Sequence, residues 1–183
     1  RSALDACELM NVGVNYMREH MPDAARIHYA YLDVGGAAPN VVQSTATVRQ
    51  LIRASDNATL RELIPRVHDI AKGAALMTGT TVTTKVYSGV SNLVGNLPLE
   101  QAMQAEFDKL GPVPFEKEDE AFAEEIRKTL TTEDIAASFQ RAGRQTPPEL
   151  PLCDFVAPLD RPSHGGEGST DVGDVSWVTP TVQ

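Results

Sequence analysis

Cysteine and histidine, the side chains most typical of nucleophilic and zinc sites, are few in this chain and lie far apart. The cysteines and histidines are Cys7, Cys153, His20, His28, His68 and His164. A nucleophilic site needs a serine or cysteine beside a histidine, and a zinc site needs several His, Cys or carboxylate ligands. No such spacing is visible here. Cys7 falls on an apolar helical stripe, which predicts a buried thiol, and His28 lies in a tyrosine-containing strand, which predicts a core residue.

The C-terminal part of the chain holds the histidine with the most chemical context. Glycines and Glu167 surround His164, but one histidine near carboxylates is a weak indication of a metal site. Asp171 and Asp174 follow glycines, which is typical of a turn whose carboxylates accept backbone hydrogen bonds. Neither of the glycine pairs, Gly35–Gly36 and Gly165–Gly166, has the strand–turn–helix context of a phosphate-binding loop. Residue chemistry alone therefore predicts no active site.

The composition predicts a globular protein and disfavours polyanionic partners. The chain has 183 residues, with 16 basic against 25 acidic side chains and a formal charge of −9. An acidic chain repels phosphate backbones, so we expect no nucleic-acid partner. No apolar run reaches the roughly 20 residues of a membrane span, and no basic-plus-apolar leader precedes the first helix. We expect a soluble, cytoplasmic protein without a membrane partner.

The first half of the chain has a regular alternation of helix and strand patterns. The periodicity of its apolar residues predicts helix, strand, strand, helix and strand, at residues 2–21, 27–33, 41–53, 55–78 and 81–88. Glycines and Pro39 at residues 35–40 predict a turn, so the first two strands form an antiparallel hairpin. Pro65 lies inside the second helix and predicts a kink or a later start.

This order of elements predicts an α/β fold of the α+β kind. It is the ferredoxin-like arrangement, βαββαβ, without its first strand, over residues 1–90. A sheet that lacks one strand leaves a neighbour with an unpaired edge, which natural proteins avoid. The pattern therefore indicates that the chain is a fragment of a longer protein.

The second half, residues 91–183, has weaker patterns. Amphipathic periodicity predicts helices at 97–110, 116–130 and 132–139, and the run 172–178 predicts a last strand. Between them, residues 143–168 are rich in proline and irregular. A stretch of that length is typical of a functional loop or of a segment whose partner structure is missing.

Three stretches together resemble a known family. They are RSALDA at 1–6, GGAAPNVV at 35–42 with LIRA at 51–54, and GSTDVGDVSW at 168–177. The family is the dinuclear-zinc amidohydrolases that include aminoacylase and carboxypeptidase G, and the most similar branch acts on p-aminobenzoyl-glutamate. The resemblance covers essentially the whole chain.

The resemblance implies that this chain contains parts of two domains of a longer enzyme. Residues 1–90 would be most of a ferredoxin-like lid and dimerisation domain, and residues 91–183 the C-terminal part of the catalytic domain. Family members bind two divalent metal ions, zinc or manganese, through ligands that match nothing in this chain. The resemblance therefore implies no catalytic and no metal-binding residue here, and an isolated chain that is inactive.

Asn40, Arg53 and Ser169 match positions at which the family holds its substrate. Arginine suits this role because its planar fork pairs with a carboxylate through two hydrogen bonds. Thirteen steps of extended chain at about 3.3 Å each place Asn40 roughly 40 Å from Arg53. Both residues therefore contact one small ligand only if the lid of a second protomer, in a homodimer or a heterodimer, supplies the asparagine.

The leading prediction is a fragment of an amidohydrolase that cleaves N-acyl amino acids, with p-aminobenzoyl-glutamate as the expected small-molecule substrate. The alternative is a non-catalytic module that dimerises or binds a small molecule, since ferredoxin-like folds serve such roles as well. An RNA-binding sheet needs a basic face with exposed aromatic residues, and the charge of −9 opposes it.

Overall fold

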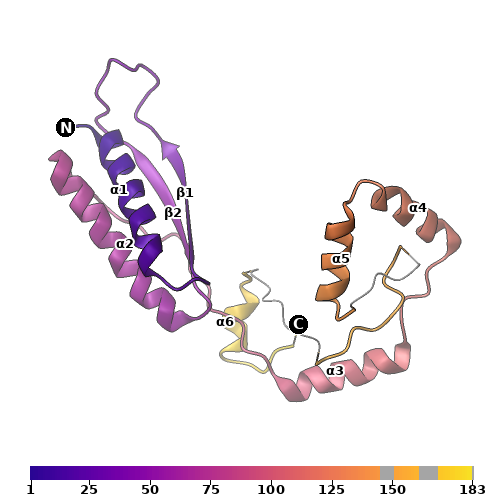
Figure 1. The fold of residues 1–183 in the computed structure, drawn as a ribbon. Helices are drawn as coiled ribbons and strands as arrows, with labels where there is room; N and C mark the ends of the chain where they lie inside the picture. Colours follow the sequence, from indigo (N-terminus) through magenta and orange to yellow (C-terminus); the bar gives the residue numbers. More distant parts are fainter. Residues whose placement is uncertain (145–150, 161–168, 183) are drawn as a thin grey trace. The chain divides into compact units, whose positions relative to one another are not determined.

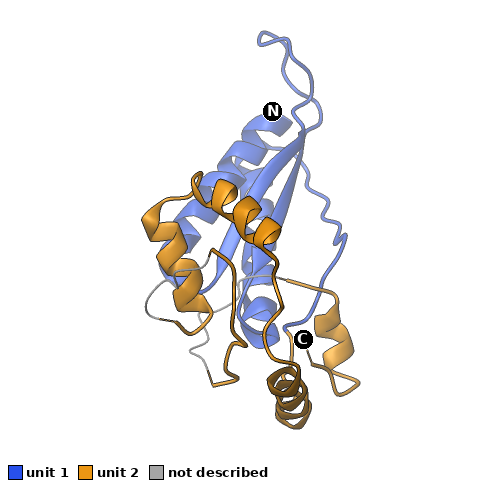
Figure 2. Cartoon of the chain, turned by 90° about the vertical axis from the view of Figure 1, so that its right-hand side faces the viewer, with its two compact units in different colours: residues 1–92 blue, residues 93–183 orange. Residues whose placement is uncertain are grey.

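The computed structural model describes residues 1–144, 151–160 and 169–182 (Figure 1). His164, Glu167 and the glycines beside them lie outside the described residues. The chain divides into two compact units, residues 1–92 and 93–183 (Figure 2). The boundary predicted after residue 90 lies two residues from this division. Among the described residues, no helix combines the length and the apolar character that crossing a membrane requires.

Unit 1 consists of two long helices packed on a β-hairpin (Figure 1). Its elements are α1 (Ala3–Met17), the 3-10 turn η1 (Arg18–His20), β1 (Arg26–Asp33), β2 (Thr47–Arg53) and α2 (Asn57–Thr78). The strands pair antiparallel, as the sequence predicts. The mixed helix and sheet content of the predicted fold class is confirmed.

The ends of both helices are fixed by capping residues. The Ser2 hydroxyl accepts a hydrogen bond from the Asp5 backbone N–H at the start of α1. Asp56 accepts one from the Thr59 backbone N–H at the start of α2, and this bond lowers the pKa of the Asp56 carboxyl. Gly79 ends α2 at φ +63°, where a side chain is disfavoured.

Pro65 lies inside α2. The helix already begins at Asn57, so the prediction that it starts after the proline is wrong. A proline removes one backbone hydrogen bond from a helix interior. Leu63 and Val67 flank it and are fully buried, so the apolar face of α2 remains anchored on both sides of the missing bond.

The core of unit 1 lies between the helices and the inner face of the hairpin. Its largest fully buried side chains are Val14 from α1, Ile27 from β1, and Leu63 and Val67 from α2. Gly13 lets the helices come close together, because a Cβ there would lie 2.7 Å from Cγ2 of Ile70.

The register of the hairpin decides which side chains face outward. Ile27 pairs with Ile52 on the inner face, and the next pair, His28 and Leu51, falls on the outer face. His28 is exposed, so its prediction as a core residue is wrong. The tyrosines beside it occupy inner positions, and strand alternation places the histidine on the other side.

The third strand predicted at 81–88 is wrong. The described sheet has two strands, and residues 80–96 form no helix or strand. The β-branched residues of this segment favour extended backbone, but a strand also needs a neighbour with which to exchange backbone hydrogen bonds. Every residue from 81 to 90 is exposed. The ferredoxin-like arrangement therefore stays a prediction.

Unit 2 is built from short helices that bury little. They are α3 (Leu97–Leu110), α4 (Lys117–Arg127), α5 (Thr132–Arg141) and α6 (Val172–Ser176). The first three confirm the predicted helices, with α5 capped by Thr131. None of these three contains a buried residue.

The last strand, predicted at 172–178, is wrong because α6 occupies most of it. The backbone N–H groups of Gly173 and Asp174 donate to the carbonyls of Thr170 and Asp171, which closes two consecutive turns. No strand is present in the described part of unit 2, so an extended segment there has no pairing partner.

Replacement of a core leucine tests whether the helices and the hairpin share one core. Leu63→Ala should lower the free energy of unfolding by about 2–5 kcal/mol, since it removes buried methyl groups and leaves a cavity. Leu76→Ala on the same helix is the matched control, because Leu76 is 83% exposed. Urea unfolding followed by circular dichroism measures both, and equal losses for the two variants would contradict this core.

Candidate functional site

Arg53, the predicted carboxylate-binding residue, lies at the last position of β2 and is half-buried. The hairpin register places Arg26, the first residue of β1, directly opposite it. Arg26 donates from its Nη1 to the backbone carbonyls of Ala25, at 2.8 Å, and of Asp23. Two guanidinium groups therefore share one end of the outer sheet face. Like charges directly opposite each other destabilise a sheet, which makes this end suited to an anion.

Asn40 lies in the loop 34–46, which joins β1 to β2 and extends beyond the hairpin (Figure 1). Its side chain is exposed. Residues 38–41 of the loop form a turn, in which the Val41 N–H donates to the Ala38 carbonyl at 3.2 Å. The asparagine amide is therefore presented at an exposed turn.

The base of this loop is fastened to the start of α1. The Ala3 N–H donates to the Gln43 carbonyl at 3.0 Å, and the Ser2 hydroxyl donates to Gln43 Oε1 at 3.2 Å. Gly35 closes the other side at φ +78°, where a Cβ would lie 2.3 Å from the Thr45 carbonyl oxygen. These contacts hold the loop at its base and leave its tip free to contact a ligand.

The hairpin separates Asn40 from Arg53. The loop leaves the sheet at the Asp33–Thr47 pair, and Arg53 lies at the opposite end. The seven residues of β2 alone span about 20 Å. The 40 Å obtained for a fully extended chain is too long, because residues 41–46 belong to the loop. The separation still exceeds what one small ligand spans within a single chain.

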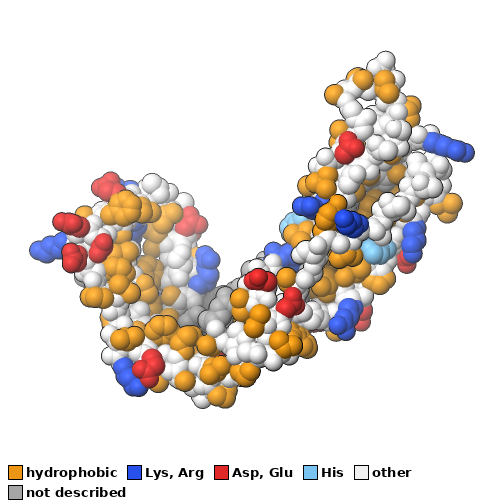
Figure 3. Space-filling model, turned by 180° about the vertical axis from the view of Figure 1, so that it is seen from behind, with side chains coloured by type: hydrophobic (Ala, Val, Ile, Leu, Met, Phe, Trp, Pro, Cys, Tyr) orange, Lys and Arg blue, Asp and Glu red, His pale blue; other side chains and the backbone are white. Residues whose placement is uncertain are grey.

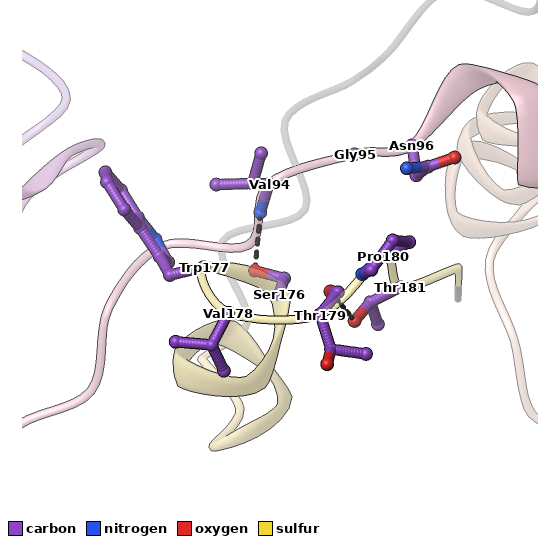
Figure 4. Close-up of a pocket in the computed structure, with 9 residues that line it drawn as sticks. All are labelled: Val94, Gly95, Asn96, Ser176, Trp177, Val178, Thr179, Pro180 and Thr181. Atoms are coloured by element: carbon purple, nitrogen blue, oxygen red, sulfur yellow. Dashed lines mark hydrogen bonds between the residues drawn. The ribbon is translucent and has the colours of Figure 1, made fainter.

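Ser169 is exposed and lies in unit 2, just before α6. A shallow cavity of about 260 Å³ lies at the C-terminal end of that helix, between residues 94–96 and 176–181 (Figure 4). The Val94 N–H donates to Ser176 Oγ at 2.9 Å across it. Ser169 does not line this cavity. Ser169 is therefore an exposed residue outside this cavity.

The other side chains considered for chemistry give no reactive centre. Cys7 is half-buried, and burial raises the pKa of its thiol, which disfavours the reactive thiolate. Cys153 is exposed, and its thiol donates to the Phe155 carbonyl. Among residues 1–144, 151–160 and 169–182, no group of three His, Cys, Asp or Glu side chains is arranged to hold a metal ion.

Sequence reasoning missed the cationic end formed by Arg26 and Arg53. The net charge of −9 describes the chain as a whole and conceals a local excess of positive charge. One signal was available in the sequence: side chains alternate between the two faces of a strand, which places Arg49 and Arg53 on one face of β2. The register that brings Arg26 opposite Arg53 is seen only in the structure.

The chain is similar to known hydrolases over its whole length. It is 41% identical to one of the subunits of p-aminobenzoyl-glutamate hydrolase from Escherichia coli K12, over 100% of this chain and 40% of the relative. It is 23% identical to the Xaa-Arg dipeptidase of Mus musculus, over 99% of this chain and 32% of that protein. No family model matches the chain. The predicted resemblance to p-aminobenzoyl-glutamate hydrolase is confirmed.

A methyl group at Gly35 tests the loop that carries Asn40. Gly35→Ala should destabilise the loop base, because the φ of +78° disfavours a side chain and the new Cβ meets the Thr45 carbonyl. Hydrogen exchange should become faster at the Ala3 amide, which bonds to Gln43 in this loop. Gly73→Ala is the control, since nothing lies within 4 Å of its Cβ. An unchanged rate of hydrogen exchange at the Ala3 amide in Gly35→Ala would show that the loop base does not depend on Gly35.

Proposed function

From the similarity over its whole length to p-aminobenzoyl-glutamate hydrolase, we propose that this chain is part of a hydrolase of N-acyl amino acids. The proposed substrate is p-aminobenzoyl-glutamate, which hydrolysis converts to p-aminobenzoate and glutamate. Unit 1 acts as a lid that recognises the substrate carboxylate and associates with a second protomer. The similarity carries the proposal, and the outward position of Arg53 beside Arg26 supports the role in carboxylate recognition.

Arg53 binds a carboxylate of the glutamyl end. The guanidinium fork forms two parallel charge-assisted hydrogen bonds with a carboxylate, which fix both the position and the orientation of the ligand. The half-buried position of Arg53 strengthens such a pair, because water screens it less than a fully exposed one. In the same proposal, the Asn40 amide and the Ser169 hydroxyl donate hydrogen bonds to the substrate.

The site is shared between two protomers. Asn40 and Arg53 lie at opposite ends of the hairpin of one chain, so a ligand bound to Arg53 receives its asparagine from a neighbouring lid. The bacterial relative is one of the subunits of its enzyme, which supports an assembly with a second chain. The described sheet has two strands and therefore two open edges, which suit pairing with another copy or a related chain.

The divalent metal ions implied by the resemblance do not fit the residues described here. Those residues supply no group of three metal-ligating side chains. We derive no hydrolytic step from this chain, and we expect the isolated 183 residues to bind substrate without cleaving it. The bacterial relative extends well beyond the 40% of its length that this chain spans.

Substitution of Arg53 tests carboxylate recognition. Arg53→Gln should weaken binding of p-aminobenzoyl-glutamate about tenfold or more, since it removes a charge-assisted pair. Saturation-transfer NMR on the aminobenzoyl protons measures this binding, even when it is weak. Arg61→Gln is the control, because Arg61 is exposed on α2, away from the sheet face. Equal loss in both variants, or no loss in Arg53→Gln, would contradict the role of Arg53.

Mixing of two defective variants tests the shared site. Asn40→Ala and Arg53→Gln chains should each bind poorly alone. A hybrid dimer contains one site with both native residues, so an equimolar mixture should recover about a quarter of the sites by random pairing. Sedimentation velocity confirms that dimers form in the mixture. Dimers that recover no binding would contradict the shared site, as would a strictly monomeric chain.

A further inference from the structure

Short of the Asp33–Thr47 pair at its loop end, the outer face of the hairpin carries cationic side chains on either side of an exposed leucine. We call it the open face and define it by Arg26, His28, Arg49, Leu51 and Arg53. Both helices of unit 1 cover the opposite face, and Leu51 is 55% exposed. In Figure 3, Lys and Arg side chains lie among hydrophobic ones over unit 1. The open face is therefore a surface on which charge and apolar contact are available together.

One end of the open face holds the pair Arg26 and Arg53, and the other holds a second cationic group. The Arg49 guanidinium lies 5.3 Å from the ring centre of Tyr87, and Lys85 Nζ lies 5.0 Å from the same centre. Tyr87 itself is 67% exposed. The negative face of the ring holds both cations near it without neutralising their charge.

No carboxylate among the described residues pairs with these cations. The ion pairs of the described residues are three lysine–acid pairs on helices, Lys72–Asp69, Lys109–Glu106 and Lys128–Glu125. In a chain that carries 25 acidic residues, acidic partners for a surface arginine are abundant. Cations left unpaired at both ends of one face are therefore available to an external anion.

The spacing of the two cationic ends selects an extended ligand. Arg49 and Arg53 lie on the same face four residues apart, which corresponds to about 13 Å along the strand. An extended chain of about four residues covers this distance. Leu51 lies between the two arginines and offers apolar contact to the methylene groups of such a chain.

We propose that the open face binds an oligoglutamyl chain, whose first glutamate is held by Arg53 and whose later carboxylates reach Arg49 and Lys85. This inference rests on the proposed function, because it extends the ligand bound at Arg53. A short polycarboxylate fits better than a nucleic acid. The charge of −9 repels a long polyanion, whereas a short ligand interacts mainly with cations within a Debye length of about 10 Å.

Two synthetic ligands test the proposal on the 183-residue chain: p-aminobenzoyl-glutamate and p-aminobenzoyl-tetraglutamate. The tetraglutamyl ligand should bind roughly three- to tenfold more tightly at low salt, as one or two exposed ion pairs allow, and the advantage should vanish in about 0.5 M salt. Arg49→Gln should remove the advantage and leave binding of the monoglutamyl ligand unchanged. Arg61→Gln, the control on α2, should keep both affinities.

Equal affinity for the two ligands in the wild-type chain would overturn the proposal. So would equal effects of Arg49→Gln and Arg61→Gln, or a single-stranded oligonucleotide that competes as well as the tetraglutamyl ligand does. Tighter tetraglutamyl binding that needs Arg49 but is unaffected by Arg53→Gln would support the open face while contradicting the role proposed for Arg53. Failure of the further inference and failure of the proposed function are thereby distinguishable.

Discussion

The burial of one face of the hairpin under α1 and α2 is the constraint on which unit 1 depends. Ile27, Leu63, Val14 and Val67 are almost completely excluded from water and meet between the two layers. A strand has a side-chain period of two, so a register shift of one residue would move every inner residue to the outer face. The same packing that keeps Ile27 inside therefore keeps Arg53 and its neighbours outside.

This constraint also determines how the hairpin presents the side chains that we propose bind the ligand. The cations of the open face stand on paired strands, whose backbone positions the ladder fixes. Asn40 instead stands on a loop whose base is fastened through Gln43 and whose tip is exposed. Paired strands fix the distances between their charged side chains, whereas an exposed loop can change conformation to fit a neighbouring molecule. In the proposed function, recognition of a carboxylate and contact between protomers therefore use different parts of one hairpin.

The sequence predicted the features that are decided locally. The two helices predicted in unit 1 are present, and their ends at Ser2, Asp56 and Gly79 depend on capping chemistry within a few residues. The segments 81–88 and 172–178 failed because a strand depends on a partner that local sequence does not contain. The alternation of side chains along a strand predicts that Arg49 and Arg53 lie on one face. The position of Arg26 opposite Arg53 follows only from the register of the hairpin, which the structure supplies. The predicted substrate contacts of Asn40, Arg53 and Ser169 stay predictions.

The exposed segment 81–88 has the composition of an aggregation-prone strand, with Lys85 in its middle. Its sequence, TVTTKVYS, is rich in β-branched residues, contains no proline and is exposed along its whole length. Such segments are prone to stack into intermolecular cross-β assemblies, and a charge in their middle works as a gatekeeper against that stacking. Lys85 is the only charged residue in this run. The cation that lies beside Tyr87 therefore occupies the position at which a gatekeeper charge opposes such stacking.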